Sequence, residues 1–132
     1  MVEKAKYTVL IVDDDDEFRT SLSKTFAKEG YQVSAAADGL EALGRIREDR
    51  FDLAIVDLKM PGLGGIELLT GIKKASPDTE VIIVTAYGET ATKLAAMRAG
   101  AFGYLDKPVK RKEILRYAER ALSKRPVKTY PA

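Results

Sequence analysis

The sequence contains no cysteine and no histidine among its 132 residues, and no tryptophan either. Without cysteine there is no disulfide framework, no thiolate metal site and no thiol nucleophile. Without histidine there is no histidine triad, no imidazole acid or base and no histidine-ligated metal. The chemistry of this chain must therefore use carboxylates, hydroxyls, lysines and hard cations.

Long hydrophobic runs are missing as well. The longest unbroken apolar stretches have four residues each: Val9–Val12, Leu53–Val56, Val81–Val84 and Leu94–Met97. A membrane-spanning helix needs about 20 such residues, and the polar start of the chain does not resemble an export signal. We therefore expect a cytoplasmic protein without a membrane segment.

The composition is that of one folded domain, because 45% hydrophobic and 32% charged residues provide both a core and a soluble surface. The formal net charge of +2 is unevenly spread, since residues 107–128 are strongly basic. Four basic residues recur there at four-residue spacing: Lys112, Arg116, Arg120 and Lys124. We interpret this stripe as a solvated helix face, with an acidic partner surface or nucleic acid as the alternative, and do not expect nucleic acid to be a partner of this domain.

Short apolar runs alternate along the chain with amphipathic segments. Residues 8–12, 53–56 and 81–84 show no period-two alternation, which is typical of strands buried on both faces. Residues 31–35 alternate and predict an edge strand, and residues 102–105 give a weaker fifth strand. Strands that alternate with helices indicate a single α/β domain with a doubly wound parallel sheet.

Five amphipathic segments predict the helices. Asp15 or Asp16 suits the N-cap of the first helix, and Asp38 that of the second. The second helix is expected to pack through Leu40, Leu43 and Ile46 or Arg47, and the fourth through Leu94, Ala95 and Met97.

Polar residues follow four of the predicted strands. Asp13 and Asp14 come after the first strand, Asp57 ends the third, Thr85 ends the fourth, and Lys107 lies just past the fifth. In a parallel sheet these positions share the carboxyl edge, where open α/β sheets build their sites. We therefore expect these residues to meet in one crevice.

Three carboxylates in one crevice repel one another unless a cation joins them. A site of one or two carboxylates, a carbonyl and several waters suits Mg²⁺ better than Ca²⁺. The remaining carboxylate, Asp57, is already ionised at neutral pH and can attack phosphorus without a general base. Lys107 and Thr85 then supply an ammonium and a hydroxyl for the oxygens of the transferred phosphoryl group.

These residues belong to four motifs that together carry a family resemblance. The motifs are Val9-Leu10-Ile11-Val12-Asp13-Asp14, Asp57-Leu58-Lys59-Met60-Pro61, Val84-Thr85-Ala86 and Gly103-Tyr104-Leu105-Asp106-Lys107-Pro108, spaced along nearly the whole chain. They resemble the receiver domains of bacterial two-component response regulators. The resemblance implies a flavodoxin-like sheet of five parallel strands in order 2-1-3-4-5 with five helices. It assigns residues 7–123 to the receiver domain, 1–6 to an N-terminal extension and 124–132 to a tail or linker start.

The resemblance also implies a role for each matching residue. Asp57 matches the aspartate that is phosphorylated by a sensor histidine kinase, a phosphotransfer protein or an acyl phosphate. Asp13, Asp14 and the backbone carbonyl of Lys59 match metal ligands. The remaining matches are Thr85 and Tyr104 as the switch pair, Lys107 as the phosphate-binding lysine, and a cis bond between Lys107 and Pro108.

In such a switch, Tyr104 is expected to turn from an exposed to a buried position when the domain is phosphorylated. This turn would change the face formed by the fourth helix, fifth strand and fifth helix, which would then control a partner or output domain or support a homodimer. The resemblance implies that positions 59 and 87 flank the path of the hydrolytic water. They hold the bulky residues Lys59 and Tyr87, so we expect at most slow self-dephosphorylation. Gly64-Gly65 replaces a side-chain cap, so the third helix should begin less firmly.

Three other functions are compatible with parts of this pattern. A phosphatase of the haloacid-dehalogenase type would also use an aspartate nucleophile and Mg²⁺, and Asp13-x-Asp15 fits its pattern, but Glu17 does not and no cap domain fits in this length. A flavin carrier needs a phosphate loop where this chain has four aspartates. An inert scaffold would not need the complete site. The sequence does not determine the cognate kinase, the pathway, the output or the oligomeric state, nor whether the domain stands alone.

Overall fold

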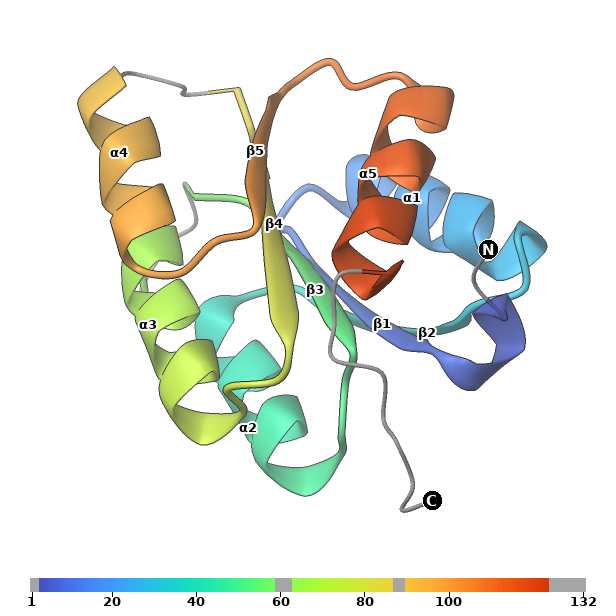
Figure 1. Ribbon diagram of the computed structural model, residues 1–132, viewed down its shortest axis with the longest axis horizontal. Helices are drawn as coiled ribbons and strands as arrows, with labels where there is room; N and C mark the ends of the chain where they lie inside the picture. The colour runs from blue at the N-terminus through green and yellow to red at the C-terminus, as the bar shows by residue number, and fades with distance from the viewer. Residues whose placement is uncertain (1–2, 59–62, 87–89, 124–132) are drawn as a thin grey trace.

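The computed structural model describes residues 3–58, 63–86 and 90–123. Five parallel strands form one sheet in the order β2-β1-β3-β4-β5, as expected (Figure 1). The strands are β1 (Thr8–Val12), β2 (Gln32–Ala36), β3 (Leu53–Val56), β4 (Glu80–Thr85) and β5 (Gly103–Asp106).

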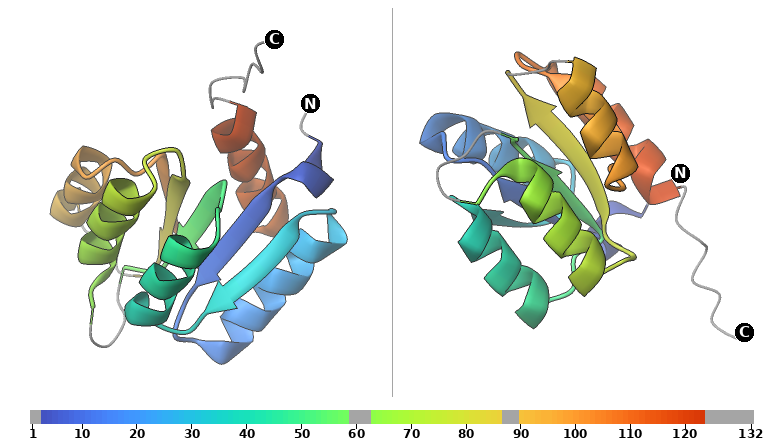
Figure 2. Two further views of the ribbon diagram at one scale, coloured as in Figure 1. Left: turned by 90° about the horizontal axis from the view of Figure 1, so that it is seen from below. Right: turned by 90° about the vertical axis from the view of Figure 1, so that its left-hand side faces the viewer.

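A short 3₁₀ helix, η1 (Lys4–Lys6), precedes the sheet, and five α-helices connect or follow its strands. They are α1 (Asp16–Lys28), α2 (Gly39–Glu48), α3 (Gly65–Ala75), α4 (Thr90–Arg98) and α5 (Arg111–Ser123). Helices α1 and α5 cover one face of the sheet, and α2, α3 and α4 cover the other (Figure 2). Among the described residues, no helix has the length and apolar character needed to cross a membrane.

Strand β1 shows why the buried runs lack alternation in sequence. Val9 and Ile11 pack into the core under α1 and α5, whereas Leu10 and Val12 pack into the core under α2, α3 and α4. All four side chains are almost completely buried. A strand covered on both faces needs apolar side chains at every position, which confirms the assignment made from the sequence.

Helix starts and stops follow the predicted signals. The side chain of Asp15 caps α1 by accepting from the amides of Glu17 and Phe18. Asp38 caps α2 by accepting from the Glu41 amide at 2.8 Å. Gly30 ends α1 with a positive φ of 105°, which glycine adopts without strain. Gly64 is the N-cap of α3 and offers no side-chain hydrogen bond.

The predicted apolar face of α4 is wrong. Leu94 and Met97 are 51% and 47% exposed, and the buried residue of this helix is Ala96. Leu94 and Met97 have alanines as neighbours in the sequence. The spacing of apolar residues therefore does not indicate which side of this short helix packs on the sheet. In α2 the predicted Leu40 is likewise wrong, since it is 73% exposed, but the predicted Ile46 is buried and Leu43 packs against the core. Gly39 and Ala42 complete the buried face of this helix.

Candidate functional site

The sheet register brings the predicted site residues to one edge. Val12 of β1 lies opposite Val56 of β3, so Asp13 and Asp57 leave the sheet side by side. Backbone bonds extend the ladder one step further, from the Asp57 amide to the Val12 carbonyl at 3.1 Å. Thr85 lies opposite Asp106, and the Lys107 amide donates to the Thr85 carbonyl at 2.9 Å.

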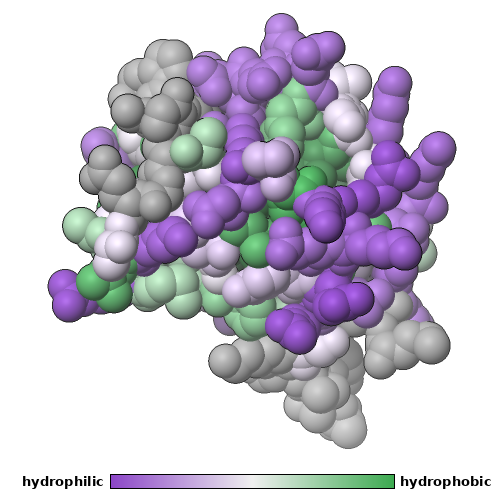
Figure 3. Space-filling view, turned by 90° about the horizontal axis from the view of Figure 1, so that it is seen from above, coloured by the Kyte–Doolittle hydropathy of each residue, from purple (hydrophilic) through white to green (hydrophobic). Residues whose placement is uncertain are grey.

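Three carboxylates converge at this edge, which the view in Figure 3 looks down upon. Asp13, Asp14 and Asp57 each place one carboxylate oxygen within 4.8 Å of the others. Asp13 and Asp57 are buried and Asp14 is exposed, so the cluster opens to solvent on one side. We call these three residues the acidic site. Carboxylate oxygens in such a set are the ligands that a hard divalent cation prefers.

Lys107 reaches into the acidic site from beyond β5. Its ammonium donates to Asp13 Oδ2 at 2.7 Å and to Asp57 Oδ2 at 3.2 Å. Its side chain is only 16% exposed. The peptide bond that follows, between Lys107 and Pro108, is cis as the resemblance implied. One ammonium against three carboxylates leaves the site with net negative charge.

The pKa values of the site reflect burial and these contacts. Burial raises the pKa of the Asp13 carboxyl above its usual value, in spite of the hydrogen bonds from Lys107 and the Asp15 amide. Burial alone would lower the pKa of Lys107, but its contacts with Asp13 and Asp57 outweigh that effect and raise the pKa. The lysine is therefore a permanent cation over the physiological pH range.

Thr85 and Tyr104 lie next to the acidic site. Thr85 is completely buried at the end of β4. Tyr104 faces α4 and is half-buried. It packs against the core, and the Lys93 ammonium lies over its ring, 5.3 Å from the centroid. Burial, together with the charges of Asp106 and Asp57, raises the pKa of the Tyr104 hydroxyl.

Lys59 and Tyr87, which were predicted to tune the site, lie outside the described residues. Within the described part of the chain, three further neighbours of the site were not predicted from the sequence. Arg19 donates to the Asp13 carbonyl at 2.7 Å, Lys93 contacts Asp106 at 3.3 Å, and the Phe18 ring lies 4.1 Å from the Lys107 ammonium. Their charge or aromatic character is visible in the sequence, but the reach of a side chain across elements is not.

A family model described as the response regulator receiver domain matches residues 9–119. The chain belongs to this family. Sporulation initiation phosphotransferase F of Bacillus subtilis (strain 168) is 43% identical to this receiver domain over 100 residues, which cover 76% of this chain and 81% of that protein. The transcriptional regulatory protein ZraR of Klebsiella oxytoca and the response regulator MprA of Mycobacterium avium (strain 104) are longer relatives, of which the matched part covers 23% and 47%.

Solved structures agree with the family. A CheY-like receiver domain protein from Methanospirillum hungatei JF-1 has a TM-score of 0.87 at 35% identity, over 89% of this chain and 94% of that one. The beryllofluoride-activated NtrC4 receiver domain dimer has a TM-score of 0.83 at 34% identity, over 88% and 96%. The function is that of a receiver domain, a signalling switch phosphorylated by a sensor kinase. Nothing in these matches supports the phosphatase alternative.

Proposed function

We propose that Asp57 is the residue that accepts the phosphoryl group. The observation that carries this proposal is its place in the acidic site: Asp57 ends β3 alone, shares the site with Asp13 and Asp14, and lies 3.2 Å from the Lys107 ammonium. Lys107 bridges this carboxylate to that of Asp13, which it contacts at 2.7 Å. The resemblance to receiver domains assigns the acceptor role to Asp57.

In this reaction a carboxylate oxygen of Asp57 attacks phosphorus and forms a new oxygen–phosphorus bond. At the same time the bond between phosphorus and the donor atom breaks. The donor atom is the imidazole nitrogen of a phosphohistidine or the acetate oxygen of acetyl phosphate. The leaving group keeps the electron pair. A carboxylate can act as a nucleophile in its own right, and this chain has no histidine to serve as a general base.

Asp13, Asp14 and Asp57 fit Mg²⁺, because their oxygens lie close together and one side is open to water. The resemblance adds the backbone carbonyl of Lys59 to this set. A bound Mg²⁺ would supply positive charge for the phosphoryl oxygens. Lys107, whose ammonium lies 3.2 Å from Asp57 Oδ2, would supply further positive charge, and Thr85 would offer a hydroxyl to the phosphoryl group.

The phosphorylated form is proposed to act through Thr85 and Tyr104. To move an equilibrium from 1:99 to 99:1 requires about 5.5 kcal/mol, and each charge-assisted hydrogen bond contributes roughly 1.5–3 kcal/mol. Two or three new bonds from Thr85, Lys107 and the adjoining loop therefore suffice. Movement of Tyr104 then alters the face of α4, β5 and α5.

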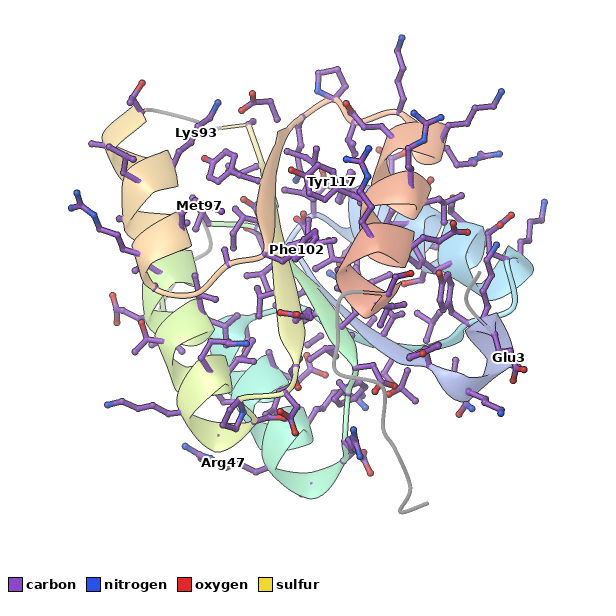
Figure 4. All side chains as sticks on the ribbon, in the orientation of Figure 1. Glu3, Arg47, Lys93, Met97, Phe102 and Tyr117 are labelled. Atoms are coloured by element: carbon purple, nitrogen blue, oxygen red, sulfur yellow. The ribbon has the colours of Figure 1, made fainter. Side chains whose placement is uncertain are left out.

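That face is the proposed contact for an output domain, a partner protein or a second copy of the chain. The similar beryllofluoride-activated NtrC4 receiver domain is a dimer. Lys93 and Met97 of α4 and Tyr117 of α5 lie on either side of β5 (Figure 4). The proposed phosphodonor is a sensor histidine kinase or phosphotransfer protein in the cytoplasm. The proposed receiver unit spans residues 7–123, and the bulky Lys59 and Tyr87 are proposed to keep self-dephosphorylation slow.

Incubation with acetyl phosphate and Mg²⁺, followed by intact-mass measurement, tests the proposed acceptor. We expect a gain of about 80 Da, the mass of one phosphoryl group, which peptide mapping locates at Asp57. Asp57→Asn should abolish the gain, and the control Asp78→Asn, which changes an exposed aspartate in the turn before β4, should keep it. Labelling that survives Asp57→Asn would show that another residue is the acceptor.

A further inference from the structure

Among the residues that the structure describes, three side chains contact the ammonium of Lys107 in the acidic site. Two are the carboxylates of Asp13 and Asp57, at 2.7 Å and 3.2 Å. The third is the aromatic ring of Phe18, whose centroid lies 4.1 Å from the nitrogen. A cation at this distance from a ring face is attracted by the negative charge of the π-system, over a range of about 6 Å. The ring therefore attracts the lysine ammonium through a cation–π interaction, in addition to packing beside it.

The place of Phe18 follows from the helix that carries it. Phe18, Leu22 and Phe26 are four residues apart in α1 and lie on the same side of the helix. Leu22 and Phe26 are buried against the sheet. Phe18, one turn nearer the N-terminus, is half-buried at the carboxyl edge. Packing alone would accept any large apolar residue there, but only an aromatic one presents a ring face to the ammonium.

The lysine needs such a partner because its four-carbon stem is flexible. In the proposed reaction the ammonium turns from the oxygens of Asp13 toward the phosphoryl oxygens on Asp57. A hydrogen bond to Asp13 weakens during this turn, because it depends on direction. Attraction to a ring face depends less on direction, so it persists while the ammonium moves.

We propose that Phe18 is a positioning residue for phosphoryl transfer, whose ring face holds the Lys107 ammonium in the acidic site and keeps water from that side of it. The inference rests on the proposed function, since it acts through Lys107 on the phosphoryl group of Asp57. It predicts that the rate of phosphorylation depends on the charge of the ring face and not only on the size of the side chain.

A series of fluorinated phenylalanines at position 18 separates the effect of ring charge from the effect of side-chain size. Each added fluorine removes negative charge from the ring face and changes its size little. With acetyl phosphate as donor, we expect the rate constant at saturating donor to fall stepwise, by about fivefold over the series, with little change in KM. Phe18→Leu should be phosphorylated about as slowly as the protein with the most highly fluorinated ring. Phe18→Tyr should be phosphorylated at the wild-type rate.

The matched control is the same series at Phe26. This residue lies in the same helix and is completely buried, and its ring contact is with Tyr31 rather than with a cation. Its fluorination should leave the rate unchanged. A flat series at position 18, or an equal fall at positions 18 and 26, would overturn the proposal. So would a fluorine dependence that persists in a Lys107→Met background.

A second measurement needs no reaction. In the NMR spectrum of the unphosphorylated protein, the ring current of Phe18 should shift the ε-methylene protons of Lys107 upfield, and Phe18→Leu should abolish the shift. An unshifted wild-type signal would overturn the proposal. Normal labelling of Asp57 with a flat fluorine series refutes the role of Phe18 alone, whereas absent labelling of Asp57 refutes the proposed function and this inference together.

Discussion

Tyr31 has a buried hydroxyl at the end of the sheet opposite the acidic site. The residue lies just before β2, is 4% exposed and packs on Phe26 with ring centroids 5.4 Å apart. Its hydroxyl has no hydrogen-bond partner among the described residues. Burial is the main cause that raises the pKa of Tyr31 to about 12. The ring therefore contributes to the core, while the hydroxyl carries a cost of desolvation.

Tyr31→Phe should increase the free energy of unfolding at pH 7 by about 1 kcal/mol, because it removes a buried hydroxyl without removing the ring. Urea denaturation of the two proteins measures the difference. The companion variant Tyr31→Leu should be less stable than wild type, since it removes the ring contact with Phe26. A loss of stability in Tyr31→Phe would show that the hydroxyl is hydrogen-bonded in solution.

The difference in the free energy of unfolding between wild type and Tyr31→Phe should grow at high pH. The pKa of Tyr31 is higher in the folded chain than its usual value of about 10, so ionisation above pH 10 favours the unfolded state. The free energy of unfolding of wild type, relative to Tyr31→Phe, should fall by up to about 2–3 kcal/mol between pH 10 and 12. Below pH 10 the difference should be constant, and a difference that stays constant to pH 12 would contradict the raised pKa.

At the scale of the elements, α3 begins at two glycines with different roles. Gly64 is the N-cap, with φ −71° and ψ 161°, a conformation that any residue adopts. A β-carbon there would meet nothing closer than the Glu67 carboxylate, at 3.4 Å. Gly65 lies against the backbone after β3, and a β-carbon there would come within 2.4 Å of Leu58 Cα. Only the second glycine is required by packing.

Gly64→Ser should raise the free energy of unfolding by about 0.5 kcal/mol, because serine caps the helix and forms a capping box with Glu67 three residues later. Gly65→Ala should lower it by about 1–3 kcal/mol, because the chain after Asp57 must move to admit the methyl group. Chemical denaturation of both variants measures these opposite signs. If both variants were destabilised to the same extent, the N-cap assignment at Gly64 would be wrong.

The elements themselves were largely predictable from the sequence. Buried strands were found because both of their faces are apolar, as in β1, and helix starts were found because Asp15 and Asp38 cap them. The orientation of α4 was not predictable, because Leu94 and Met97 are surrounded by alanines that pack equally well. Its position on the sheet is decided by tertiary contacts, which periodicity does not contain.

At the scale of the whole molecule, the acidic site exists only when the sheet is assembled. Asp13 and Lys107 are 94 positions apart, and they meet because β1 and β5 run in the same direction and end at the same edge. This convergence was predictable, since parallel topology fixes which ends of the strands coincide. The contact of Phe18 with Lys107 was not, because it depends on how far two side chains reach from different elements.

A cation bound at this edge should therefore stabilise the whole fold. Binding only to the folded chain adds about 1.4 kcal/mol to the free energy of unfolding at a concentration ten times the Kd. We expect Mg²⁺ to raise the melting temperature in a saturable way at constant ionic strength, and EDTA to reverse the rise. Asp14→Asn, which removes the exposed carboxylate of the acidic site, should slightly stabilise the metal-free protein and abolish most of the response, whereas Asp78→Asn should respond like wild type. An equal response in all three proteins would place the bound Mg²⁺ elsewhere on the surface.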